Sequence, residues 1–196
     1  MSTLSLAALY KLHAGQHFVV AAPGPSLGAL PAADRVIAVN LAIETTPADY
    51  WLVIDRPDRI PEPDRRQRFL AAPQGAPMLL PTTSVGAWDR DAYVYALGIP
   101  PHDRTYPFAA TSRDGFPILP QFRGCGMTAA AAAIYMGARR VTLCGVDHTG
   151  AKAPGCRSER DSLVEMWREF AAVAKRQGVT MAQANPESPI QFTAGS

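Results

Sequence analysis

Residues that commonly bind or transfer charged groups follow the apolar segments of this sequence, each time at the point where a segment ends. Carboxylates hold protons or hard metal ions, a histidine can act as a base near neutral pH, and glycine lets a backbone approach a phosphate. If the segments are parallel strands, their ends meet at one edge of a sheet, which is where open α/β folds bind ligands. The residues are Gly24 to Ser26 after 17–22, Asn40 after 35–39, Asp55 after 49–54, Asp147 with His148 after 139–146, and Asn185 after 178–184.

The loop Pro-Gly-Pro-Ser at 23–26 is stiff, yet it contains a glycine directly after an apolar run. One interpretation is a tight turn from a strand into a helix, with Ser26 as the N-cap. Another is that the amides after Gly24 lie at a helix N-terminus and hold a phosphate. The two interpretations are compatible. We expect some group to approach this backbone closely, and a phosphate is the group that we favour.

A second glycine-rich loop, RGCGMTA at 123–129, also opens a helix. Gly124, Gly126 and Ala129 match the pattern G-x-G-x-x-A, which is nearly the dinucleotide fingerprint. That fingerprint must follow a strand directly, and the preceding segment carries Pro117 and Pro120, which argue against a central strand. We therefore do not favour NAD. A helix N-terminus that offers amides to an anion is expected whatever the ligand is.

The carboxylates and the histidine at the strand ends each allow two interpretations. Asp55 and Asp147 could together hold Mg²⁺ against phosphate oxygens, because hard cations prefer carboxylate oxygen. Alternatively, either of them only caps a turn. His148 stands where a general base or a phosphate contact could lie, and the alternative is a structural or merely exposed histidine.

The apolar segments do not alternate with polar residues, which indicates strands buried on both faces, as in a parallel sheet. Helices are expected at 127–138, which is alanine-rich, and between Ser158 and Gly178, with a shorter one at 64–72. We also expect a helix in the first fifteen residues, closed by Gly15. More than half of the 18 prolines lie between 56 and 123. These patterns predict an α/β fold, a Rossmann-like three-layer sandwich with a mostly parallel sheet and a Pro-rich loop region over one edge.

Length and composition limit the classes of function. At 196 residues the chain is expected to form one domain, 1–196. A net charge of +2 does not predict nucleic-acid binding, and no apolar run is long enough for a membrane span. Three cysteines without metal-ligand spacing predict neither a disulfide framework nor a zinc site, and they favour a reducing cytoplasm. A homo-oligomer is left open.

Four blocks, in this order, resemble a known superfamily. They are APGPSL at 22–27, VIAVN at 36–40, GCGMTAAAAAIYMGARRVTLCGVD at 124–147 and ANPESPIQF at 184–192. The superfamily includes bacterial sialyltransferase-like enzymes, the motility accessory factors that decorate flagellin, and 6-hydroxymethylpterin diphosphokinases of the MptE-like type, together with phage proteins. The resemblance implies a Rossmann-like nucleotide-binding fold. By that resemblance the nucleotide pocket would be lined by Gly24, Pro25, Ser26, Asn40, Gly124, Gly126, Thr128 and Asn185.

The resemblance implies a transferase that acts on a small-molecule nucleotide, and glycosyl transfer from a nucleotide sugar of the CMP-linked sugar acid type is the leading hypothesis. Asp147 or His148 would then be the base for the incoming hydroxyl. One alternative is a diphosphokinase that uses ATP and Mg²⁺, held by Asp55 and Asp147, on a pterin-like alcohol. Another is a nucleotide-binding accessory protein without turnover, because segment 148–161 is shorter than the sialyltransferase lid and has no tyrosine.

Overall fold

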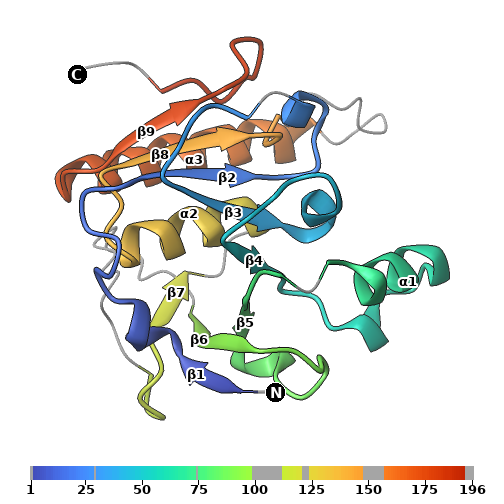
Figure 1. Ribbon diagram of the computed structural model, residues 1–196. Coiled ribbons are helices and arrows are strands. Elements are labelled where there is room, and N and C mark those ends of the chain that lie inside the picture. The colour runs from blue at the N-terminus through green and yellow to red at the C-terminus, as the bar shows by residue number, and fades with distance from the viewer. Residues whose placement is uncertain are drawn as a thin grey trace.

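The computed structural model describes residues 2–28, 30–73, 75–98, 112–120, 124–147 and 157–192. Its strands form one sheet in which every described pair is parallel (Figure 1). The strand order is β1-β6-β5-β4-β3-β2-β8-β9, and β7 pairs with β6. The strands are β1 (Thr3–Ser5), β2 (His17–Ala21), β3 (Arg35–Val39), β4 (Tyr50–Leu52), β5 (Met78–Pro81), β6 (Ala92–Gly98), β7 (Ile118–Pro120), β8 (Arg140–Cys144) and β9 (Thr180–Gln183).

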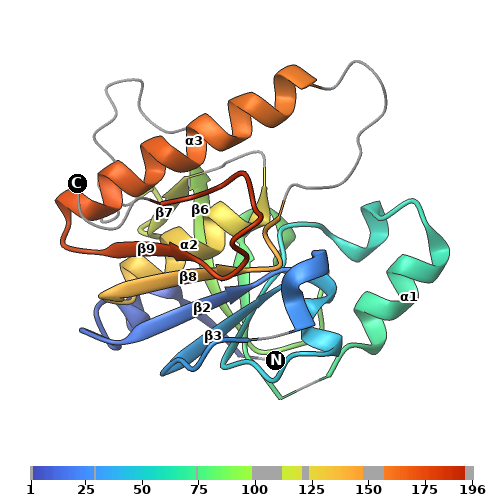
Figure 2. The same cartoon turned by 90° about the horizontal axis from the view of Figure 1, so that it is seen from above.

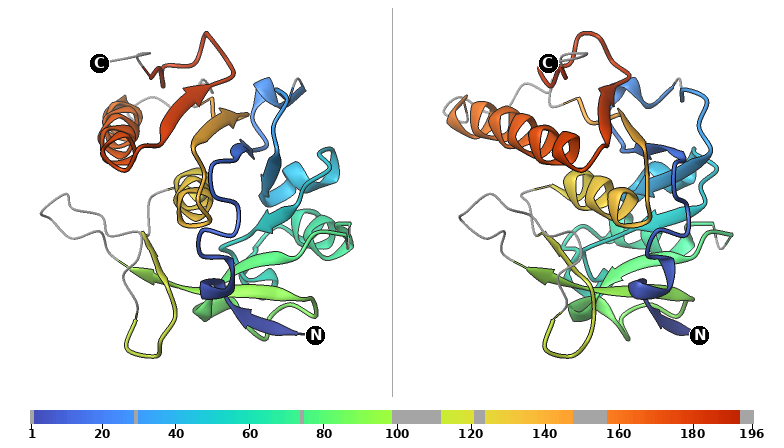
Figure 3. Two further views of the ribbon diagram at one scale, coloured as in Figure 1. Left: turned by 60° about the vertical axis from the view of Figure 1, so that its left-hand side comes forward. Right: turned by 90° about the vertical axis from the view of Figure 1, so that its left-hand side faces the viewer.

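Helices cover both faces of the sheet. Helices α2 (Cys125–Tyr135) and α3 (Arg157–Arg176) lie on one face, and α1 (Pro63–Ala71) lies on the other (Figures 2 and 3). Short 3₁₀ helices complete the described chain: η1 (Leu6–Leu9), η2 (Pro25–Gly28), η3 (Asn40–Glu44), η4 (Pro57–Arg59) and η5 (Thr82–Ser84). The expected three-layer α/β sandwich is therefore confirmed.

The core explains why the apolar segments do not alternate. Ile37 and Val39 of β3 pack in the cluster that contains α2 and α3, whereas Ala38 between them packs in the cluster that contains Phe69 of α1. Successive side chains of a strand point to opposite faces, so a sheet covered on both faces needs an apolar residue at every position. The alanines at 129–133 of α2 are fully buried, because small side chains let this helix lie close to the sheet.

Two sequence predictions about the elements are wrong. The first fifteen residues do not form one α-helix; they contain the edge strand β1 and the 3₁₀ helix η1 before Gly15. In the Pro-rich region from 56 to 123 the helix expected at 64–72 is confirmed as α1, but strands β6 and β7 lie in the later stretch that was expected to form loops. Segment 116–122, whose prolines argue against a strand, does contain the short strand β7, which pairs only with β6 among the described strands.

The sheet has a switch point between β2 and β8. From β2 the chain builds neighbours in one direction through β3, β4, β5 and β6, and it then returns to add β8 and β9 on the other side. Loops that leave two such neighbouring strands in opposite directions open a crevice at the carboxyl edge, which is the usual ligand site in open α/β sheets.

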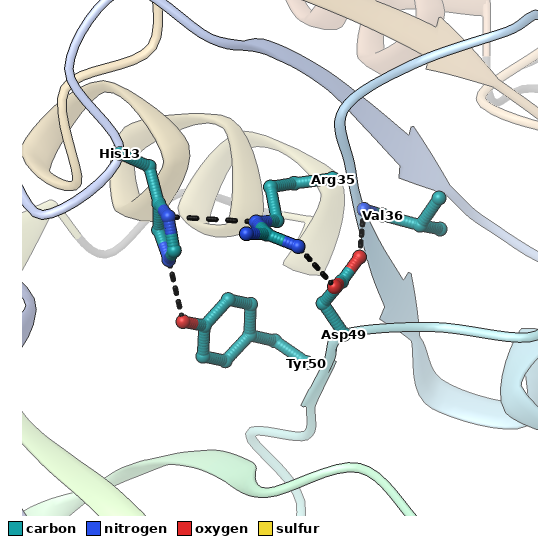
Figure 4. A network of polar contacts seen from close by, with 5 residues as sticks. All are labelled: His13, Arg35, Val36, Asp49 and Tyr50. Atoms are coloured by element: carbon teal, nitrogen blue, oxygen red, sulfur yellow. Dashed lines mark hydrogen bonds and ion pairs between the residues drawn. The ribbon is translucent and has the colours of Figure 1, made fainter.

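The opposite edge, where the strands begin, carries a network of polar side chains (Figure 4). His13 contacts the hydroxyl of Tyr50 through Nε2 at 2.7 Å, and its Nδ1 accepts a hydrogen bond from Arg35 at 3.4 Å. Arg35 also pairs with Asp49, whose second oxygen accepts the amide of Val36. Because Arg35 can only donate, the neutral His13 ring carries its proton on Nε2.

Candidate functional site

A cavity of about 300 Å³ opens at the carboxyl edge, at the switch point of the sheet. The ends of β2, β3 and β8, the first turn of α2 and one side of α3 line it. This volume is at the lower end of the range of small-molecule pockets. The sequence-predicted residues that line it are Gly24, Pro25, Asn40, Gly124, Gly126 and Asp147. These six residues therefore lie around one cavity, while their roles stay predictions.

The Pro-Gly-Pro-Ser loop is approached closely by the loop that follows β8. A Cβ atom at Gly24 would lie 2.1 Å from the carbonyl oxygen of Gly145 and 2.8 Å from Oδ2 of Asp147. A Cβ atom at Gly145, whose φ is +72°, would lie 1.8 Å from the carbonyl oxygen of Ala22. The group that needs a glycine at position 24 is thus the backbone of the same chain.

The Asp147 carboxylate joins the loops that follow three strands. Asp147 is 2% exposed, and its Oδ2 accepts the amide of Ser26 at 2.8 Å. Its Oδ1 accepts the Ser26 hydroxyl at 2.6 Å and the Asn185 amide group at 2.9 Å. The Ser26 Oγ in turn accepts the amide of Gly145. Asp147 therefore fixes the ends of β2, β8 and β9 relative to one another.

The amides of the first glycine loop are already used. Gly24 N donates to Ala22 O, Ser26 N donates to Asp147, and Leu27 N donates to Gly24 O. The expectation that these amides are open to a phosphate therefore does not match the structure: the negative charge at the Ser26 amide is the Asp147 carboxylate. Gly24 and Pro25 contribute wall to the cavity instead.

The first turn of α2 is the part of the cavity wall whose structure suits an anion. Gly124 is the N-cap residue in an extended conformation, it gives no side-chain cap, and the residues from Gly124 to Met127 all line the cavity. The amide of Met127 donates to the carbonyl oxygen of Gly124, which leaves the amides of Cys125 and Gly126 at the start of the helix, where the helix dipole adds positive potential. Burial raises the pKa of the Cys125 thiol, so this side chain stays protonated and serves as wall, not as a nucleophile.

Asn40 stands between α2 and the sheet in a left-handed conformation, with φ +51°. Its carbonyl oxygen accepts the indole N–H of Trp51 at 2.7 Å, and its Nδ2 lies 3.6 Å from the sulfur of Cys125. The side-chain oxygen Oδ1 is buried and has no hydrogen-bond partner among the described residues. A buried acceptor without a partner costs about 1–3 kcal/mol. A ligand that donates a hydrogen bond to Asn40 would remove this cost.

The remaining predicted residues lie outside the cavity wall. Ser26 and Asn185 act behind it through Asp147, and Thr128 is fully buried within α2. Asp55 is half exposed and lies 3.8 Å from Arg65. Among the described residues no three His, Cys, Asp or Glu side chains gather as metal ligands. The magnesium site of Asp55 and Asp147 stays a prediction, and His148 lies outside the described residues.

Sequence reasoning missed two groups of residues at this edge. Trp167 of α3 packs in the hydrophobic core and also forms part of the cavity wall. Arg65 and Arg68 of α1 line a second, adjacent cavity of about 500 Å³. The run Arg-Arg-Gln-Arg at 65–68 was the available signal, but nothing local indicates which way these arginines face.

The fold and the cavity define a Rossmann-like α/β protein with a cavity at the carboxyl edge of a parallel sheet. No family model matches the sequence, and no curated protein matches it. The fold is similar to that of the MAf glycosyltransferase from Magnetospirillum magneticum, at 15% identity and a TM-score of 0.44 over 77% of this chain. It is also similar to the sialyltransferase CstII from Campylobacter jejuni, solved with the substrate analogue CMP-3FNeuAc, at 13% identity and a TM-score of 0.42.

These likenesses concern the arrangement of the chain and assign no activity. This chain spans 28% of the length of the Magnetospirillum protein and 81% of that of the Campylobacter protein, in the latter case over 88% of its own residues. In the part of the chain that the structure describes, no helix combines the length and apolarity needed to cross a membrane.

Proposed function

We propose that this protein is a transferase that binds a nucleotide-activated donor in the 300 Å³ cavity, and that the donor is a nucleotide sugar of the CMP-linked sugar acid type. One observation carries the proposal: the first turn of α2, with Gly124 and Gly126, faces a cavity at the switch point of a parallel sheet. This arrangement suits the phosphate of a nucleotide. The preference for a CMP-linked sugar rests on the sequence resemblance.

For this reaction the site must stabilise negative charge on the leaving nucleotide. In glycosyl transfer the bond between the sugar and the phosphate oxygen breaks, and the electron pair leaves with the nucleotide. The amides and the dipole of α2 would stabilise that charge as it develops. The acceptor hydroxyl forms the new bond and gives its proton to a base, for which His148 remains the candidate.

In this proposal Asp147 is a positioning residue and not the base. Its carboxylate is buried and accepts hydrogen bonds from Ser26 and Asn185, so taking up a proton would break contacts that hold three strand ends together. Its role is to keep the cavity wall in place while the bound donor reacts.

Thermal unfolding in the presence of ligands tests the proposal. We expect CMP and CDP to raise the melting temperature without Mg²⁺, because a ligand at 100 times its Kd adds about 2.7 kcal/mol of stability. Stabilisation by ATP only with Mg²⁺ would favour the diphosphokinase. Stabilisation by CMP without transfer or hydrolysis of a CMP-linked sugar would favour an accessory protein. Stabilisation by NAD alone would contradict the assignment to this class of nucleotide-binding proteins.

A further inference from the structure

A second cavity of about 500 Å³ adjoins the first at the carboxyl edge. Pro23, Gly24 and Asn40 line both, so one ligand can extend from one cavity into the other. The far wall of the second cavity is formed by Glu44 of η3 and by α1, which lies beyond the carboxyl ends of the strands (Figure 1). The proposed nucleotide phosphate binds at α2, and the second cavity is where the rest of a donor would lie.

The two arginines of this cavity differ in their partners. Arg68 is neutralised, because its Nε and Nη2 both donate to the carboxylate of Glu44, with Nε 3.0 Å from Oε1. Arg65 lies 3.8 Å from Oδ2 of Asp55 and 3.9 Å from Oε2 of Glu62, beyond hydrogen-bond distance, and it donates no hydrogen bond to a described residue. The guanidinium of Arg65 therefore has donors to offer to a ligand.

The charged residues of the cavity wall agree with this difference between Arg65 and Arg68. The charged residues of the wall are Arg65, Arg68 and Glu44. Glu44 pairs with Arg68, whereas the carboxylates nearest to Arg65, those of Asp55 and Glu62, do not line the cavity and lie 3.8 and 3.9 Å from its guanidinium nitrogens. Guanidinium groups bind phosphate and carboxylate through two parallel hydrogen bonds. Asp55 and Glu62 compete for the same group, so we expect moderate affinity that weakens with salt.

We infer that the second cavity is a subsite for an anionic group of the ligand, a phosphate or a carboxylate, and that Arg65 binds it. The inference deepens the proposed function, on which it rests for the identity of the ligand part in the first cavity. A sugar acid linked to CMP carries both kinds of group, one phosphate and one carboxylate. The subsite would therefore help to distinguish an acidic donor from a neutral one.

Titration calorimetry with cytidine, CMP and CMP-linked sialic acid tests the inference on wild-type protein and Arg65→Gln. We expect Arg65→Gln to weaken binding of a ligand with the anionic group about tenfold, equivalent to about 1.4 kcal/mol, and to leave cytidine binding unchanged. A loss confined to CMP-linked sialic acid identifies the carboxylate, and a loss already present with CMP would place the nucleotide phosphate at Arg65 and not at α2. Arg139→Gln, which removes the same charge at the opposite edge of the sheet, should change neither.

A second variant moves affinity in the other direction. Glu44→Gln releases the guanidinium of Arg68 from its ion pair, so pyrophosphate and the anionic nucleotide should bind at least about threefold more tightly. Unchanged or weaker binding in Glu44→Gln would count against the inference. Both side chains are partly exposed, and melting temperatures close to that of the wild type would show that the variants fold.

The outcomes for the subsite and for the proposed function are separable. If CMP and CMP-linked sialic acid bind wild type and Arg65→Gln equally, the proposed function stands and the subsite is wrong. If no nucleotide binds, but pyrophosphate or free sialic acid binds wild type and is lost in Arg65→Gln, the subsite stands and the proposed function is wrong. If none of these probes binds the wild type, both are wrong.

Discussion

At the scale of single residues, two glycines at the carboxyl edge are needed for the contact between two loops of the chain itself, whether or not a ligand is bound. Gly24 and Gly145 allow the loops after β2 and β8 to touch through their backbones. We expect Gly24→Ala to lower the free energy of unfolding by about 3 kcal/mol, the upper part of the range for overpacking, because the new Cβ would meet a carbonyl oxygen and not a flexible side chain. Urea unfolding measures this change. Gly28→Ala is the matched control, since a Cβ there meets nothing within 4 Å; equal losses in the two variants would contradict the contact.

The Asp147 network makes a separate prediction about coupling. The Ser26 hydroxyl donates to the Asp147 carboxylate, so substitutions of these two side chains should not be additive. We expect Ser26→Ala and Asp147→Asn to show a coupling energy of about 1 kcal/mol or more in a double-mutant cycle of urea unfolding. Ser5→Ala removes a hydroxyl that accepts only the amide of Ala7 and should be additive with Asp147→Asn. Additivity in the Ser26 cycle would mean that the network does not hold the loops.

At the scale of elements, the first turn of α2 is the part of the cavity wall that we expect to contact a ligand. A Cβ at Gly126 would lie 3.4 Å from Val146 and 3.6 Å from Trp167, which are ordinary contacts, so Gly126→Ala should fold. Its methyl group adds to the cavity wall, and we expect nucleotide affinity to fall about tenfold, or about 1.4 kcal/mol, while thermal stability without ligand is kept. Titration with CMP checks this, with Gly28→Ala again as the control. Unchanged affinity would place the phosphate elsewhere.

The elements that could be predicted from sequence are those whose environment is uniform along their length. β2, β3 and β8 are buried on both faces and read as continuous apolar runs, and α3 shows its apolar stripe around Trp167. β1 has three residues and two of them are exposed, so it carries no such pattern. β6 lies in the Pro-rich region and includes half-buried positions. Its pairing with β1 joins residues that are far apart along the chain, such as Thr3 and Ala92, and a local pattern does not contain such a contact.

Some features of the candidate site could likewise be predicted from the sequence, and others could not. Asn40, Gly124, Gly126 and Asp147 could be placed at one edge because parallel strands end together. Their partners could not: the contact of Gly24 with Gly145, and the orientation of Arg65 toward the cavity, join segments that are distant in sequence. We expected a phosphate to approach the first glycine loop closely. A close approach is present, but the approaching group is the backbone of the loop that follows β8.

At the scale of the whole molecule, the two edges of the sheet carry different polar chemistry. The carboxyl edge holds the two cavities, and the amino edge holds His13 with Arg35, Asp49 and Tyr50 in a closed network. Burial, followed by the charge of Arg35, lowers the pKa of His13, and Asp49 opposes this only in part. Burial also lowers the pKa of His17, whose ring contacts Thr142. Protonation of these two histidines should therefore act on the amino edge and on stability.

The resulting pH dependence has a definite sign. A histidine whose pKa is lowered by folding stays neutral in the folded protein while the unfolded chain takes up a proton, so the free energy of unfolding falls as pH drops below about 6.5. The loss continues down to the folded pKa, at less than about 1.4 kcal/mol per pH unit for each histidine. Urea unfolding at intervals from pH 8 to pH 5 measures it. In His13→Gln the slope of the free energy of unfolding below pH 6.5 should be shallower than in the wild type. His102→Gln replaces a histidine outside the described residues and serves as the control, because it should leave the contribution of His13 to this slope unchanged. A slope that is unchanged in His13→Gln would mean that the network of Figure 4 does not control the titration of this edge.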